Sequence, residues 1–118
     1  MDLTCVELEI KSDGRYVYDT GLSFEIPEGY VGLIFPRSSV SKKDLILANS
    51  VGVVDSGYRG PVKAVFKPTT EDPNRYTPGD RCCQLVVMPH PIVNFKDVGD
   101  EQLTESDRGA GGFGSTGQ

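Results

Sequence analysis

Two stretches of the chain hold residues whose types could do chemistry, and the first is residues 51–60, Val-Gly-Val-Val-Asp-Ser-Gly-Tyr-Arg-Gly. Its three valines favour a buried strand, a Ser-Gly pair supplies turn chemistry, and residues 62–66 are typical of the returning strand of a hairpin. The tip of this hairpin would carry Asp55, Tyr58 and Arg59, which are one acid, one flat ring and one cation on a rigid support. An acid that closes an Asx-turn beside a surface tyrosine is the simpler interpretation of this stretch alone.

The second stretch is the C-terminus, residues 108–118, Arg-Gly-Ala-Gly-Gly-Phe-Gly-Ser-Thr-Gly-Gln. Glycine at this density does not hold a stable strand, so we predict a tail that is mobile when free. Its backbone N–H groups could wrap an anion, Arg108 could pair with phosphate, and Phe113 could stack on a planar base. A flexible tail with no task is the alternative, and no lysine follows the glycines as it would in a Walker A loop.

Length and charge limit the classes of function. With 118 residues, 37% of them hydrophobic and 25% charged, the chain is predicted to be one globular domain. Its net charge of −5 argues against direct binding of nucleic acid, because nothing neutralises the backbone phosphates broadly. A phosphate-bearing ligand would be small and held by a few placed cations. No apolar run approaches the ~20 residues that span a membrane, and we expect no membrane association.

The cysteine and histidine content predicts neither a disulfide framework nor a zinc site. Cys5 makes the number of cysteines odd, and Cys82 and Cys83 are adjacent in a predicted strand, so we interpret these two as small apolar fillers. A reducing, cytoplasmic setting fits this pattern. His90 stands between two prolines without a second ligand at metal-binding spacing, which is typical of a loop.

The rest of the chain alternates short apolar segments with turns, as strands do. Strands are predicted at residues 5–10, 15–18, 21–26, 30–35, 46–48, 81–88 and 92–98. Helical character is confined to residues 38–44, where a serine could cap one or two turns. Many short strands with at most one short helix predict an all-β fold, closed or sandwiched, over residues 1–107, followed by the tail.

Four segments resemble the second to fifth motifs of one family, the trimeric dUTP nucleotidohydrolases (dUTPases). They lie in the family's order and are residues 36–39 (Pro-Arg-Ser-Ser), 52–60, 79–85 (Gly-Asp-Arg-Cys-Cys-Gln-Leu) and 108–117. The first motif of the family usually reads Ala-Gly-Tyr-Asp-Leu, and the chain opens with its end, Asp2-Leu3, after Met1. The resemblance implies a jelly-roll-like distorted barrel that assembles into a homotrimer with active sites shared between subunits.

The resemblance also implies an activity, the hydrolysis of dUTP to dUMP and pyrophosphate. Asp55 would hold and deprotonate the water that attacks the α-phosphorus, and Tyr58 would pack under the deoxyribose and exclude a 2′-hydroxyl. The cofactor would be Mg²⁺, which Asp2 would hold through water. Such an enzyme limits uracil in DNA and supplies dUMP for thymidylate synthesis.

The remaining site residues follow from the same resemblance, motif by motif. Uracil would be read by Asn49, Gly52, Val53, Val54 and Lys63. The phosphates would be contacted by Arg37, Ser38, Ser39 and Gln84. The tail would close over the triphosphate and the base with Arg108, Phe113, Gly114, Ser115 and Thr116.

Three alternatives are left open by the residues. We assign a structural role to Arg81 and a ligand-binding role to Gln84, although Gln84 could equally be a structural, hydrogen-bonded side chain. A dCTP deaminase shares the implied fold and trimer, but the glutamate motif that its chemistry needs is absent. A non-catalytic module that senses dUTP or binds a regulator would keep the fold, and the retention of Asp55 and Tyr58 argues against it.

Overall fold

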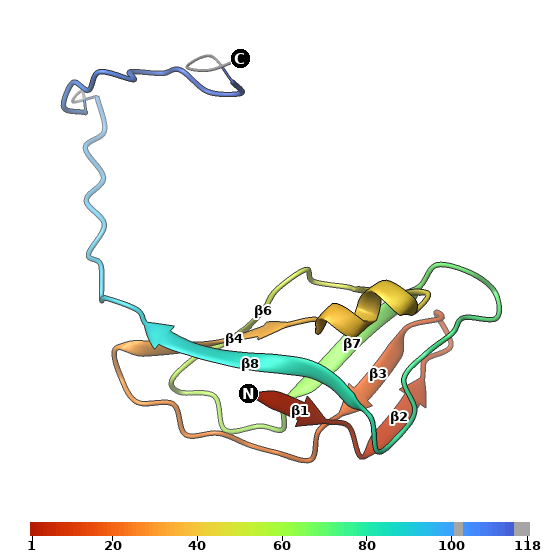
Figure 1. Ribbon diagram of the computed structural model, residues 1–118. Coiled ribbons are helices and arrows are strands. Elements are labelled where there is room, and N and C mark those ends of the chain that lie inside the picture. The colour runs from red at the N-terminus through yellow and green to blue at the C-terminus, as the bar shows by residue number, and fades with distance from the viewer. Residues whose placement is uncertain (101–102, 115–118) are drawn as a thin grey trace.

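Two antiparallel sheets of four strands each form the protein in residues 1–100 and 103–114, those that the computed structural model describes. In spatial order the first sheet holds β1 (Asp2–Thr4), β8 (Arg81–Pro89), β4 (Tyr30–Phe35) and β6 (Gly52–Val54). The second sheet holds β2 (Glu7–Ile10), β3 (Tyr16–Asp19), β7 (Lys63–Pro68) and β5 (Leu45–Leu47). One 3₁₀ helix, η1 (Ser38–Lys42), follows β4 in these residues. The predicted all-β fold with at most one short helix is confirmed (Figure 1).

The core lies between the two sheets and takes side chains from both. Leu3, Ile34 and Leu85 come from the first sheet, and Ala64 and Phe66 from the second, and each is at most 5% exposed. Fully burying an apolar side chain of leucine or phenylalanine size stabilises a fold by roughly 1.5–3 kcal/mol. Shared burial therefore holds the two sheets together.

An aromatic cluster anchors the loop before β8 to this core. The ring of Tyr76 meets the ring of Tyr18 edge to face, with 6.2 Å between the centroids, and Phe66 lies 6.0 Å away. The Tyr18 hydroxyl donates to the Tyr76 carbonyl oxygen at 2.8 Å, and burial raises the pKa of Tyr18. Tyr76 is 2% exposed, although its neighbours in the polar loop are mostly exposed.

Strand β8 is the longest strand and lies between β1 and β4. Gln84 pairs with Asp2 on one side and with Phe35 on the other. The strands predicted at residues 30–35 and 81–88 are confirmed as β4 and β8, and the predicted helical turn is confirmed as η1. Pairing with β8 brings the start of the chain beside the end of β4.

The predicted hairpin of residues 51–54 and 62–66 is wrong. β6 pairs with β4, whereas β7 pairs with β3 and β5, so the two strands lie in different sheets. The connection of residues 55–62 is longer than a two-residue hairpin turn and lets the chain cross from one sheet to the other. Successive side chains of β6 point to opposite faces, so Val54 is buried in the core while Val53 is 64% exposed. Val51, just before the strand, is 37% exposed, and the prediction of a buried strand therefore holds only for Val54.

Three other predicted strands also differ from the structure. Residues 5–10 are broken before β2, because the Cys5 N–H donates to Asp80 in one direction and the Val6 N–H to Asp19 in the other. Residues 21–26 form no strand, since Gly21 has a φ of 68°. Residues 92–98 also form no strand and lie almost entirely exposed, with no described strand beside them.

The cysteines are free thiols and all are fully buried, as expected for Cys82 and Cys83 as apolar fillers. Burial raises the pKa of the Cys5 thiol. Within the described parts of the chain, no helix is long and apolar enough to cross a membrane.

Candidate active site

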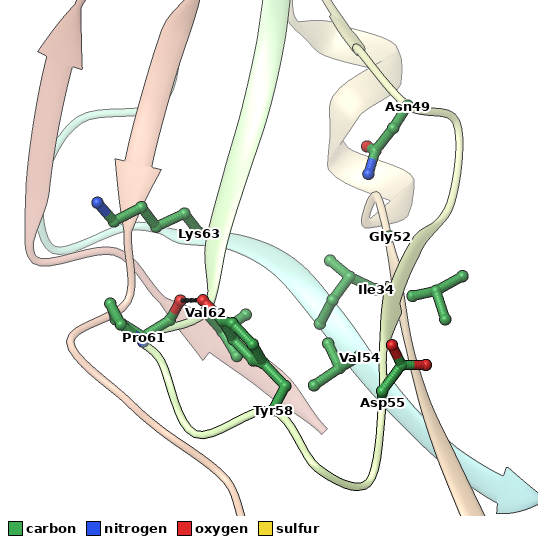
Figure 2. A pocket seen from close by; sticks show the side chains of 10 residues that line it. Ile34, Asn49, Gly52, Val54, Asp55, Tyr58, Pro61, Val62 and Lys63 are labelled. Carbon is green, nitrogen blue, oxygen red and sulfur yellow. Dashed lines mark hydrogen bonds between the residues drawn. The ribbon is translucent and has the colours of Figure 1, made fainter.

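A surface pocket of about 250 Å³, here called the Tyr58 pocket, lies where β4, β6 and the connection to β7 meet. Figure 2 shows Asn49 and Lys63 toward one end and Asp55 and Tyr58 toward the other. Outside the tail, every residue predicted to touch the base, the sugar or the attacking water lines this pocket, namely Asn49, Gly52, Val53, Val54, Asp55, Tyr58 and Lys63. Ile34, Pro61 and Val62 complete its lining and were not among the predicted site residues.

Asp55 stands at the mouth of the Tyr58 pocket, directly after β6. Its side chain is exposed, and among the described residues no ion pair or side-chain hydrogen bond engages its carboxylate. Its carbonyl oxygen accepts the Tyr58 N–H at 3.1 Å, which closes the turn that follows the strand. The carboxylate is thus held on a short turn while both of its oxygens remain available.

The ring of Tyr58 lies back against the connection that follows it. Its hydroxyl donates to the Pro61 carbonyl oxygen at 2.9 Å, a contact visible in Figure 2. A Cβ atom on Gly60 would lie 2.5 Å from the Tyr58 hydroxyl oxygen and 2.7 Å from the Cζ atom. The ring can take this position only because residue 60 has no side chain. Pro61, which lacks an N–H, contributes its carbonyl oxygen instead.

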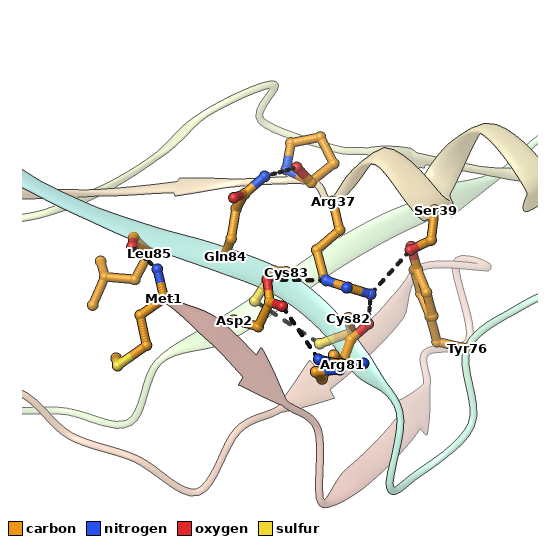
Figure 3. Close-up of polar contacts among 11 residues, drawn as sticks. Met1, Asp2, Arg37, Ser39, Tyr76, Arg81, Cys82, Cys83, Gln84 and Leu85 are labelled. Atoms are coloured by element: carbon orange, nitrogen blue, oxygen red, sulfur yellow. Dashed lines mark hydrogen bonds and ion pairs between the residues drawn. The ribbon is translucent and has the colours of Figure 1, made fainter.

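A second group of predicted residues gathers where β1, β8 and the segment after β4 meet, and it is here called the Arg37 cluster: Asp2, Arg37, Ser39, Arg81 and Gln84 (Figure 3). Arg37 Nε lies 3.0 Å from one carboxylate oxygen of Asp2, and Arg81 Nη1 lies 3.6 Å from the other. Arg37 Nη1 also donates to Ser39 Oγ at 3.3 Å. Arg81 therefore pairs with an acid of the fold, as its structural assignment predicted.

Gln84 and Ser38 are the other predicted phosphate contacts. The Gln84 amide nitrogen donates to the Pro36 carbonyl oxygen at 2.9 Å, so this side chain has a structural partner at the end of β4. Ser38 begins η1 and is exposed. None of the predicted phosphate contacts lines the Tyr58 pocket, and the single chain therefore keeps the two groups apart.

The described part of the tail, residues 108–114, stands away from the sheets in Figure 1. Arg108 donates to the nearby Gly111 carbonyl oxygen, and Phe113 and Gly114 are exposed. None of these residues lines the Tyr58 pocket. Ser115 and Thr116, also predicted to bind substrate, lie outside the described residues.

Two residues beside the Arg37 cluster were missed by the sequence interpretation. Lys43 and Tyr76 line a pocket of about 360 Å³ together with Arg37, Ser39 and Arg81. Lys43 Nζ lies 5.1 Å from the centre of the Tyr76 ring. No sequence signal marks Tyr76, because it stands in a polar segment punctuated by prolines.

Whether the chain can hold Mg²⁺ depends on the oxygen donors around Asp2. No group of three His, Cys, Asp or Glu side chains that could hold a metal occurs in the described part of the chain. The carboxylate of Asp2 is 36% exposed and shares its oxygens with two arginines. These residues do not fit an all-protein cage. They do fit a Mg²⁺ ion that takes most of its ligands from phosphate and water, as this ion commonly does.

Comparison with known proteins identifies the family of the chain. The family described as dUTPase matches residues 2–117. The chain is 47% identical to the deoxyuridine 5′-triphosphate nucleotidohydrolase of Escherichia phage T5 over 100 residues, which are 84% of this chain and 66% of that protein.

Two solved structures share its fold. The dUTPase of Staphylococcus bacteriophage 80alpha with dUPNHPP is 30% identical, with a TM-score of 0.75, and the match covers 100% of this chain and 80% of that one. A mutant dUTPase from phage phi11 of S. aureus, solved to describe the coordination of a structural Mg(II) ion, is 26% identical with a TM-score of 0.68, and the match covers 85% of this chain and 82% of that one. The fold is thus the jelly-roll-like fold of these proteins. The chain belongs to the dUTPase family, whose enzyme class is dUTP diphosphatase.

Proposed function

We propose that the chain hydrolyses dUTP to dUMP and pyrophosphate, and so limits uracil in DNA and supplies dUMP for thymidylate synthesis. The observation that carries the proposal is the Tyr58 pocket, where an aromatic ring and a carboxylate that forms no ion pair with a described residue meet the backbone of an edge strand, in a member of the dUTPase family. A water oxygen attacks the α-phosphorus, and the bond from that phosphorus to the oxygen bridging the β-phosphate breaks. Pyrophosphate leaves with the bridging oxygen.

Asp55 is the proposed general base. It holds the water and takes one of its protons, a role that a carboxylate with both oxygens available can fill. The position of Asp55 beside Tyr58 supports this role, because the same pocket would then hold the sugar and the α-phosphate next to the water.

Tyr58 and the strand backbone are proposed to select the nucleoside. The ring of Tyr58 packs under the deoxyribose and leaves no room for a 2′-hydroxyl. Gly52, Val53 and Val54 offer backbone groups on an edge strand, and such groups can pair with the polar edge of uracil because no further described strand occupies them. Asn49 and Lys63 line the same space.

The triphosphate is proposed to lie against Arg37, Ser38, Ser39 and Gln84. Guanidinium and hydroxyl groups donate to phosphate oxygens, and Arg37 is already oriented by Asp2. Asp2 would help to hold Mg²⁺ through water, and the ion, when bound, would withdraw charge from the phosphates.

A homotrimer is proposed to bring the two groups together. One chain keeps the Tyr58 pocket apart from the predicted phosphate contacts, so a complete site needs the Arg37 cluster of another copy. Apolar side chains remain exposed on β8 and beyond it, including Val87 at 48% and Phe95 at 94%, and these could be covered by such contacts. The tail of residues 108–118 would close over a site formed by other subunits.

The first experiment is pyrophosphate release from dUTP with Mg²⁺, beside UTP, dTTP and dCTP, for the chain and for Asp55→Asn. We expect release from dUTP alone and its loss in the variant. Binding of dUTP without release would instead support a module that senses dUTP, and deamination of dCTP would support the deaminase.

A further inference from the structure

Tyr76 joins the buried core to the Arg37 cluster through one hydroxyl group. Its oxygen lies 2.9 Å from Ser39 Oγ, which also accepts a hydrogen bond from Arg37 Nη1 (Figure 3). The Tyr76 ring is 2% exposed and is held in place by packing against the rings of Tyr18 and Phe66. A hydroxyl on a ring fixed in this way has little freedom to move, so it defines where Ser39 Oγ lies.

The direction of these hydrogen bonds decides what Ser39 can still do. A guanidinium group only donates, so Ser39 Oγ is the acceptor toward Arg37. If Tyr76 also donates to Ser39 Oγ, both acceptor positions of that oxygen are filled, and the serine proton is left to point elsewhere. An anion beside Ser39 favours this arrangement, because it attracts the free proton of the serine.

The surroundings of Ser39 favour an anion. The pocket of about 360 Å³ that Ser39 and Tyr76 line also receives the cationic side chains of Arg37, Lys43 and Arg81. Asp80 is the acid that lines it, and this carboxylate already accepts two hydrogen bonds from Thr77. Asp2 lies beside this pocket and pairs with Arg37 and Arg81, so the three positive side chains still outnumber the two acids, Asp2 and Asp80.

We propose that Tyr76 is a positioning residue for phosphate binding: its buried hydroxyl donates to Ser39 Oγ, so that the Ser39 hydroxyl donates to a phosphate oxygen of the substrate. The inference rests on the proposed function, which places the triphosphate against Ser39. Tyr76 itself does not touch the substrate, and its effect passes through Ser39.

A double-mutant cycle of Tyr76→Phe and Ser39→Ala tests this arrangement. The probe is the imido analogue dUPNHPP, whose dissociation constant is measured by calorimetry with Mg²⁺, together with KM and kcat for dUTP. We expect Tyr76→Phe to weaken analogue binding about fivefold and to raise KM equally, with kcat unchanged, because one oriented hydrogen bond is lost. In the Ser39→Ala background the same change should alter binding less than about 1.5-fold.

Tyr18→Phe is the matched control. It removes another fully buried hydroxyl from the same aromatic cluster, one that bonds to the Tyr76 carbonyl oxygen and not to Ser39. We expect it to lower the thermal unfolding temperature and to leave the dissociation constant of the analogue within about 1.5-fold.

Two outcomes would overturn the inference. One is an equal effect of Tyr76→Phe in both Ser39 backgrounds, and the other is no effect on analogue binding in the wild-type background. Failure of the proposed function would look different. If the wild-type chain bound the analogue but released no pyrophosphate from dUTP, hydrolysis would be refuted. The double-mutant cycle on analogue binding would still decide the role of Tyr76.

Discussion

The Tyr58 pocket and the Arg37 cluster are built in different ways. The pocket comes almost entirely from one continuous stretch, residues 49–63, and only Ile34 is added from outside it. The cluster takes its residues from the start of the chain, from the segment after β4 and from β8, which meet because β8 pairs with both β1 and β4. The difference teaches that the region proposed to bind the nucleoside and the region proposed to bind the phosphates rest on separate structural supports. Substitutions should therefore affect one without the other.

Asp55→Asn should have the largest effect, and it should be confined to catalysis. An asparagine keeps the shape of the side chain but cannot take the proton, so we expect kcat to fall by about 10²–10⁴-fold. The dissociation constant of dUPNHPP should change less than about threefold, because the pocket is otherwise intact. Asp72→Asn, an exposed acid outside both regions, is the control. Full activity of Asp55→Asn would remove the base assignment.

Arg37→Ala should separate the two regions most clearly. We expect binding of dUPNHPP to weaken by about 10–100-fold, because charged hydrogen bonds to phosphate are lost and Asp2 loses its closest arginine. Deoxyuridine, which carries no phosphate, should bind as it does to the wild type. Arg15→Ala, which breaks an exposed ion pair with Asp13, serves as the control. Equal losses for both ligands would show that the regions are coupled.

Gly60→Ala should disturb the Tyr58 pocket alone. The new Cβ atom would lie 2.5 Å from the Tyr58 hydroxyl oxygen, so the ring must move from its place against the connection. We expect the preference for dUTP over UTP, measured as the ratio of kcat/KM values, to fall by about tenfold. Gly57→Ala is a close control, because a Cβ atom there would meet nothing within 4 Å. An unchanged ratio in Gly60→Ala would count against Tyr58 as the ribose filter.

The smallest predicted effect is on stability at low pH, and it concerns Asp80 in the turn that leads into β8. Hydrogen bonds from Thr77 hold the pKa of the Asp80 carboxyl below its usual value. The contribution of Asp80 to stability is therefore complete above its unfolded pKa of about 4 and is lost as the pH falls through the lowered folded value. The difference in unfolding free energy between the wild type and Asp80→Asn should shrink from about pH 6 to about pH 3. A constant difference across that range would contradict this prediction.

The sequence predicted which residues of the Tyr58 pocket lie together, but it did not predict how the flanking strands pair. Turn residues and strand formers in residues 51–60 are local signals, and so Asp55 and Tyr58 were placed together correctly. The assignment of the flanking strands to one hairpin failed, because local propensity does not tell which sheet a strand joins. That choice depends on pairing with β4 and β3, which are distant in the sequence.

The Arg37 cluster was harder to predict for the same physical reason. Motif resemblance identified Arg37, Ser39 and Gln84 as site residues, yet the contact of Asp2 with two arginines arises from the pairing of β1 with β8. Tyr76 could not be found at all, since a tyrosine in a proline-punctuated polar segment carries no sign that its ring is buried. Its position depends on the aromatic cluster, which the tertiary fold assembles.

The central place of β8 has a consequence for how this protein tolerates changes of length. Side chains alternate between the two faces of a strand, so a single-residue insertion or deletion in β8 before Gln84 would turn that side chain to the opposite face. The same slip would shift Gln84 away from Asp2 and from Phe35 at once, because one strand sets both pairings. In the connection between β7 and β8, residues 70–72 are exposed and lie outside the Tyr58 pocket and the Arg37 cluster, so they can absorb such a change more readily. Natural variation in chain length should therefore collect in that connection and avoid β8.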